Sequence, residues 1–212
     1  MKRTPKNLIT DEVENILAIY REATPDEREF GLQWYRKANG VAKDFAELYG
    51  LRVSQVAAII AALSPNCSWT RNVIDARNLI FAYAHRQNLL KVTVTSYPLN
   101  KMKAIKILNG VRPLSVLRGP KVRSFYKCIM YPEKALAVCV DFHSVNIARG
   151  VYETMQQSKP IKPKTYAYYA ECYRAAAQKL NLAPHDLQAT VWVTWRRMHV
   201  TRDNGSLFLK FS

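Results

Sequence analysis

The sequence predicts an all-α protein, and three observations support this fold class. Apolar residues recur at helical spacing through most of the chain, as in residues 30–48 and 55–63. Capping residues or prolines precede many of these segments, and glycine follows several of them. Only residues 87–97, which contain the run KVTVTSY, alternate as a β-strand would. That stretch is either one extended segment or an ordinary connection.

The first predicted helices each begin at a recognisable signal. Thr10 is expected to cap the first, and Thr24, followed by proline and two acids, starts the second. Gly40 is a possible break in the second helix, and Ser54 is expected to cap an apolar helix in the middle of the core. These three helices are expected at residues 10–20, 25–50 and 55–63.

The remaining helices follow the same spacing rules. Asn109-Gly110 and Gly150 are expected to end two of them, and the polar segment 156–163 is the expected mobile or inter-lobe linker. The later helices are expected at residues 69–86, 98–108, 113–117, 121–130, 143–151, 164–180 and 186–198.

A short turn and a carboxylate form one candidate site. Residues 118–120 separate two short helical segments, and a turn that opens a helix leaves backbone amides and positive dipole available for a phosphate. Asp141 follows an apolar run, residues 135–140, and is expected to lie partly out of water. Asp141 as a simple cap of the next helix is the alternative.

The charge pattern predicts a polyanionic partner. The formal net charge is +16, and no acidic residue lies between Asp75 and Glu133. A nucleic-acid-binding face explains this distribution, with a generally basic, unspecialised surface as the alternative. The four cysteines form no C-x-x-C pair, so buried reduced thiols are expected. His185 and His199 form no set of metal ligands with nearby residues, so no metal site is expected.

The sequence contains no membrane or export signal. No run approaches 18 apolar residues, and the segment MKRTPKNLITDE lacks the apolar core of a signal peptide. We therefore expect an intracellular, soluble monomer without membrane contact, either cytoplasmic and nucleoid-associated or nuclear.

Three motifs occur in the order found in a known superfamily. They are the loop LSPNCSW at residues 63–69, the hairpin LRGPK at residues 117–121, and VDFH at residues 140–143. Together they resemble the helix-hairpin-helix superfamily of DNA glycosylases, the endonuclease III-like enzymes, and in particular the branch without an iron-sulfur cluster. The resemblance implies two helical lobes with DNA in the cleft between them. One lobe would be residues 54–150, and residues 1–53 with 151–212 would form the other.

The resemblance also implies roles for individual residues. Asp141 would be the catalytic carboxylate, and Asn66 would enter the space left by a flipped nucleotide, although an S-P-N turn alone is also a helix stop. Trp69 is interpreted as core packing, with base stacking as the alternative. His143 is interpreted as holding local geometry, with acid-base catalysis as the alternative. The remaining residues expected to bind DNA are Arg118, Gly119, Lys121, Arg123, Ser124 and Lys127.

The expected function is removal of a damaged or modified base from duplex DNA. Arg123 occupies the position of the nucleophilic lysine of bifunctional relatives, and an arginine cannot form a Schiff base, so no lyase activity is expected. No cofactor is expected other than a possible monovalent cation at the hairpin, which Pro120 puts in question. The alternatives are a DNA-binding protein without catalysis and an enzyme that acts on a modified base of the kind found in viral DNA.

Overall fold

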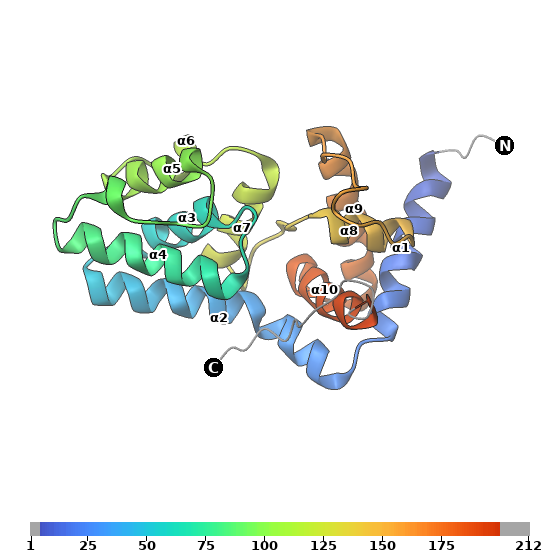
Figure 1. Ribbon diagram of the computed structural model, residues 1–212. Coiled ribbons are helices and arrows are strands. Elements are labelled where there is room, and N and C mark those ends of the chain that lie inside the picture. The colour runs from blue at the N-terminus through green and yellow to red at the C-terminus, as the bar shows by residue number, and fades with distance from the viewer. Residues whose placement is uncertain (1–4, 200–212) are drawn as a thin grey trace. The chain divides into compact units, whose positions relative to one another are not determined.

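A computed structural model describes residues 5–199, with side chains described from residue 10. Every regular element in this part of the chain is helical (Figure 1), which confirms the all-α prediction. The stretch with β-like alternation is a connection that contains one short 3-10 helix, η1 (Leu89–Lys91). Its valines are half-buried and its threonines are exposed. The alternation therefore comes from a loop with one side toward the protein and the other toward solvent.

The chain divides into two compact units. The terminal unit comprises residues 5–36 and 132–199, and the central unit comprises residues 37–131. These boundaries differ from the sequence interpretation, which placed one lobe at residues 54–150. The first boundary falls inside helix α2 (Pro25–Tyr49), where no proline, glycine pair or change in composition marks it.

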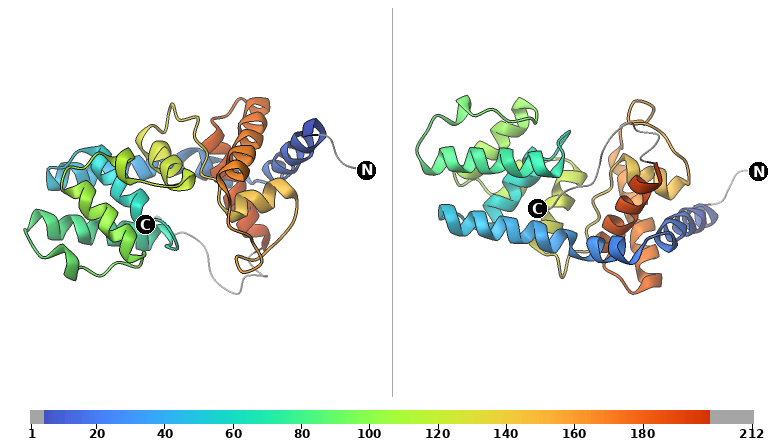
Figure 2. Two further views of the ribbon diagram at one scale, coloured as in Figure 1. Left: turned by 90° about the horizontal axis from the view of Figure 1, so that it is seen from above. Right: turned by 60° about the horizontal axis from the view of Figure 1, so that its bottom comes forward.

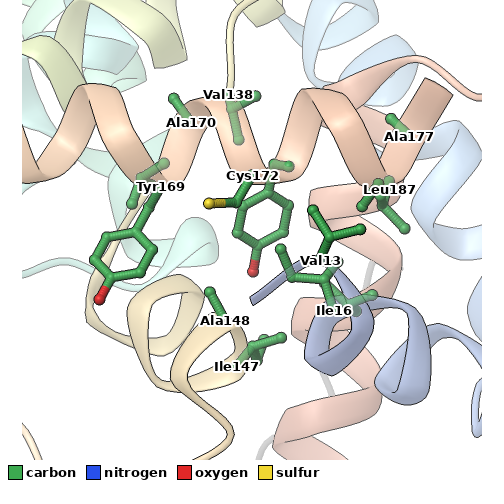
Figure 3. Close-up of a cluster of buried hydrophobic side chains, with 14 of the residues drawn as sticks. Val13, Ile16, Val138, Ile147, Ala148, Tyr169, Ala170, Cys172, Ala177 and Leu187 are labelled. Atoms are coloured by element: carbon green, nitrogen blue, oxygen red, sulfur yellow. The ribbon is translucent and has the colours of Figure 1, made fainter. Parts of the chain in front are cut away.

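The terminal unit is built from helices at both ends of the described chain. Its core joins α1 (Pro5–Arg21), α8 (Phe142–Arg149), α9 (Pro163–Leu180) and α10 (Pro184–His199). Figure 3 shows this cluster, in which Val13 and Ile16 of α1 lie near Ile147 of α8 and Leu187 of α10. Tyr173 of α9 is among the largest fully buried side chains.

The central unit is organised around α3 (Val53–Leu63). Every residue from Gln55 to Leu63 is buried, which explains why this segment is apolar on all sides. Helix α3 contacts four helices, and Figure 2 gives two further views of their arrangement. These neighbours are α4 (Trp69–Ala84), α5 (Pro98–Leu108), α6 (Pro113–Val116) and α7 (Pro120–Met130).

Three of the predicted helix boundaries are wrong. Helix α1 begins at Pro5, so Thr10 lies inside the helix and is not its cap. Helix α3 is capped by Arg52, whose backbone N–H donates to Gln55 Oε1 at 3.2 Å, and not by Ser54. Helix α2 continues through Gly40, because a single glycine costs only about 1 kcal/mol relative to alanine and does not end a long helix.

A buried histidine fixes the start of the segment between α7 and α8. His185 is fully buried, and its Nδ1 and Nε2 lie 3.0 Å from Ala135 O and 2.8 Å from Pro132 O. The ring nitrogen that carries the proton donates to the carbonyl oxygen beside it. Asp186 Oδ1 also lies 3.3 Å from Nε2.

The described part of the chain offers no single helix that is long and apolar enough to cross a membrane. Only α2 and α3 taken together reach that length and composition, and they are bent by 120°. All four cysteines are free thiols, as predicted; Cys128, Cys139 and Cys172 are buried and Cys67 is half-buried.

Candidate nucleic-acid interface and carboxylate

Positive charge is concentrated in the central unit. Residues 37–131 contain 15 Lys and Arg against 3 Asp and Glu, which gives +12 of the total formal charge of +16. One of those three acids, Asp75, is fully buried and forms an ion pair with Arg71 at 2.9 Å. The other two acids, Asp44 and Glu47, are exposed, so positive charge still dominates the surface of the central unit.

The hairpin predicted at residues 113–130 is present. Helix α6 is one turn long, and Gly119, with φ 77°, joins it to α7 as the N-cap residue. The N-cap residue of α7 makes no side-chain capping bond, because glycine has no side chain to offer. This end of α7 carries the positive end of the helix dipole.

The other hairpin residues differ in what they contact. Arg118, Lys121 and Lys127 are exposed, and Ser124 is half-buried. Arg123 is exposed, yet its Nη2 donates to Leu114 O at 2.7 Å, so its guanidinium also stabilises the end of α6.

The loop between α3 and α4 places Asn66 at an exposed tip. Asn66 has φ 58°, a left-handed conformation that asparagine tolerates well. Its Nδ2 donates to the hydroxyl of Tyr97, and Ser96 Oγ donates to Pro65 O at 3.3 Å. Sequence reasoning missed Tyr97, which is 55% exposed and is the only described side chain that bonds to the Asn66 amide. The sequence feature that could have drawn attention to Tyr97 is its position as an aromatic residue directly before Pro98, which starts a helix.

Polar contacts hold the segment that supports this tip. Thr95 N donates to Asp75 Oδ2 at 2.6 Å, and Arg71 Nε lies 2.8 Å from Thr95 Oγ1. Asp75 therefore ties the loop before α5 to α4. Trp69 is half-buried and meets Phe125 of α7 edge-on at 6.5 Å, which is a packing contact between α4 and the hairpin.

Asp141 lies in the terminal unit, at the amino end of α8. Its Oδ1 accepts hydrogen bonds from Ser144 N at 2.8 Å and from Ser144 Oγ at 2.9 Å. The carboxylate thus caps the amino end of α8, which was the alternative to a catalytic role. Capping uses one oxygen only: no residue in the described part of the chain donates to Oδ2, and the side chain is half-buried.

Aromatic rings follow Asp141 directly. Phe142 and His143 have ring centroids 3.8 Å apart, and the His143 ring meets Trp192 of α10 edge-on at 6.3 Å. His143 is 7% exposed, which fits the interpretation that it holds local geometry. Arg196 lies over the Trp192 ring, 5.2 Å from its centroid.

A family model matches residues 2–199, which is nearly the whole chain. Its description is "Family of unknown function (DUF7178)". The chain belongs to this family. No curated protein and no solved structure matches it. The function of this DUF7178 member must therefore be argued from its own residues.

The DUF7178 chain offers few groups for a cation. Among the described residues, no three His, Cys, Asp or Glu side chains cluster as metal ligands. At the hairpin, the carbonyls of Gly119 and Leu114 already accept hydrogen bonds from Arg123. A monovalent cation there would depend on the carbonyls of Leu117 and Arg118, and it stays a prediction.

Proposed function

We propose that this protein is a monofunctional DNA N-glycosylase, which binds duplex DNA through its central unit and removes a damaged or modified base with Asp141. The observation that carries the catalytic part is the asymmetry of this carboxylate. Oδ1 accepts two hydrogen bonds from Ser144, while Oδ2 accepts none from any described residue. A carboxylate fixed through one oxygen presents the other in a defined direction.

The DNA-binding part rests on charge and on the hairpin. A net +12 over 95 consecutive residues favours a polyanion through counterion release. The amino end of α7, where the N-cap is a glycine and the exposed Arg118 comes directly before it, suits a backbone phosphate. Asn66 and Tyr97, a polar and an aromatic side chain joined at an exposed tip, suit contact with bases.

The proposed reaction is hydrolysis at C1′ of the sugar. The C1′–N bond breaks and its electron pair leaves with the base, while positive charge develops on the sugar and is stabilised by Asp141. A water oxygen forms the new C1′–O bond, Asp141 Oδ2 accepts a proton from that water, and the departing base takes a proton from solvent. Since Arg123 cannot form a Schiff base, the product is an abasic site in an intact strand.

The test uses end-labelled duplexes that carry uracil, hypoxanthine, alkylated purine, 8-oxoguanine or hydroxymethyluracil, each read with and without hot alkali. Asp141→Asn is the matched variant, because asparagine caps a helix as well as aspartate does and only the charge is removed. We expect alkali-dependent breaks with the wild type and a rate about 10²- to 10⁴-fold lower with the variant. Equal rates for the two proteins would refute a catalytic role for Asp141.

A DNA-binding protein without catalysis is the second candidate. Two observations favour it: the Asp141 carboxylate already serves α8 as a cap, and Pro120 removes one amide donor from the hairpin. Salt-sensitive DNA binding without breaks on any unmodified or damaged duplex would support this candidate. Breaks confined to DNA with a virus-type modified base would instead identify the substrate.

A further inference from the structure

Three buried side chains form a chain of hydrogen bonds that ends on Asp141. Tyr35 Oη lies 3.4 Å from Gln188 Oε1, and Gln188 Nε2 lies 3.5 Å from Ser144 Oγ. Ser144 Oγ in turn lies 2.9 Å from Asp141 Oδ1. The chain crosses the terminal unit from α2 through α10 to α8, and no two of its members are neighbours in sequence.

The ionised carboxylate fixes the direction of every bond in this chain. A carboxylate only accepts, so the single hydroxyl proton of Ser144 must point to Asp141. Ser144 Oγ must therefore accept from Gln188, and only the amide nitrogen of Gln188 can donate. Gln188 Oε1 is then left to accept from the Tyr35 hydroxyl. Every proton in the chain points toward the carboxylate, an arrangement in which each bond polarises the next.

Water does not compete with these contacts. Ser144 is fully buried, and Tyr35 and Gln188 are 3% and 6% exposed. The terminal torsion of an aspartate side chain is broad and weakly restrained by itself. Two donors on Oδ1, one of them oriented by Gln188, remove that freedom.

We propose that Ser144, Gln188 and Tyr35 are positioning residues that hold Asp141 with Oδ2 as the reactive oxygen. The inference rests on the proposed glycosylase function and deepens it. None of the three touches the substrate; each acts through the next residue of the chain. A helix cap needs only an oxygen near the Ser144 amide, so capping alone does not require Gln188 or Tyr35.

The experiment compares variants of the whole 212-residue chain on the duplex from which the wild type releases the base fastest. Ser144→Ala removes one donor from Oδ1, and Gln188→Glu replaces the amide donor with a carboxylate that draws the Ser144 proton away from Asp141. Tyr173→Phe is the matched control. It removes a hydroxyl that donates to the Ser144 carbonyl at 3.2 Å in the same core, but leaves the Ser144 hydroxyl untouched. Single-turnover rate, DNA Kd and melting temperature are measured for each protein.

We expect Ser144→Ala and Gln188→Glu to lower the single-turnover rate by about 10- to 100-fold with a DNA Kd that is unchanged. Tyr173→Phe should lower the melting temperature without lowering the rate. The Gln188→Glu rate should recover as the pH falls, because a protonated carboxyl group donates to Ser144 as the amide does. A purely structural role for Gln188 predicts no such recovery.

The outcomes that overturn the inference are distinct. If Asp141→Asn is inactive but Ser144→Ala and Gln188→Glu cleave at the wild-type rate, the positioning chain is refuted and the glycosylase function stands. Rates that fall with melting temperature in all variants, Tyr173→Phe included, refute it as well. If the wild type cleaves no duplex, or Asp141→Asn cleaves as fast as the wild type, the proposed function fails and the inference fails with it.

Discussion

Gly31 of α2 lies so close to Thr190 of α10 that a β-carbon at residue 31 would stand 2.0 Å from Thr190 Oγ1 and 2.7 Å from its Cα. Thr190 is buried, and its hydroxyl donates to Asp186 O at 2.9 Å. The obstructing atoms include backbone, so no side-chain rotation relieves the overlap. The absence of a side chain at residue 31 is what lets these two helices touch inside the terminal unit.

Gly31→Ala should therefore destabilise the protein even though alanine is the better helix former. We expect the free energy of unfolding, measured by urea titration, to fall by about 1–3 kcal/mol from overpacking. Gly40→Ala is the control in the same helix, since nothing lies within 4 Å of its β-carbon position. That change should raise stability by about 0.5–1 kcal/mol. Two changes of the same sign would contradict the close contact.

Glu27 should make stability depend on acid pH. Burial acts to raise the pKa of this carboxyl group, but hydrogen bonds from Arg197 and from Thr24 N outweigh burial and hold the pKa below its usual 4.5. A carboxyl group with a lowered pKa contributes stability above its unfolded-state pKa and loses it as the pH falls through the folded-state value. Glu27→Gln should cost about 1 kcal/mol near neutral pH, because Arg197 is partly exposed.

The measurement for Glu27 is the free energy of unfolding from about pH 6 down to about pH 3. The difference between wild type and Glu27→Gln should shrink as the pH falls. Glu29→Gln is the control, since Glu29 is exposed on the same helix. A difference that stays constant over this range would show that the ion pair does not carry the effect.

His185→Phe should destabilise the terminal unit. The substitution keeps an aromatic ring against Tyr35, whose ring meets His185 edge-on at 5.3 Å, but removes both ring nitrogens. The carbonyls of Pro132 and Ala135 would then lose their partner, at a cost of about 2 kcal/mol or more in the free energy of unfolding. The same change at exposed His85 should alter stability by less than about 0.5 kcal/mol. Similar losses at both positions would show that the contacts of His185 with the carbonyls of Pro132 and Ala135 do not stabilise the protein.

Arg118→Ala and Lys127→Ala should weaken DNA binding through its electrostatic part. Each removes an exposed charge of the hairpin, so each should lower the slope of log Kd against log salt by about 0.9 if it contacts a phosphate. Lys179→Ala is the control, because Lys179 belongs to the terminal unit and pairs with Glu14 at 2.8 Å. Fluorescence anisotropy with an undamaged duplex gives the slopes. An unchanged slope for both hairpin variants would show that Arg118 and Lys127 do not contact DNA phosphates.

The sequence predicted the helices well, because their evidence is local. Among the described residues, periodicity and turn signals located every α-helix, although not the 3-10 helix η1, and α8 ends at Gly150 as predicted. The errors fall at helix starts, where several residues compete for one role. Ser54 is a better cap than Arg52 by residue type, but Gln55 Nε2 donates to Ile107 O of α5, and this tertiary contact fixes its register.

The candidate site was only partly predictable for the same reason. Asp141 and Asn66 stand in motifs that can be recognised along the chain. Gln188 and Tyr35 reach the site from α10 and α2, and no local pattern connects a glutamine at residue 188 with an aspartate at residue 141. Contacts over such separations follow from tertiary packing, which periodicity does not encode.

The division of the chain has a consequence for the order of events during synthesis. The apolar face of α1, with Val13 and Ile16, finds its partners only in residues that follow Pro132. All of residues 37–131 leave the ribosome before those partners exist. The central unit can thus complete its packing around α3 before the helices that pack against α1 have been synthesised. The basic surface therefore forms before Asp141 is added to the chain. If the central unit binds nucleic acid as proposed, truncated nascent chains would acquire this affinity before they contain Asp141.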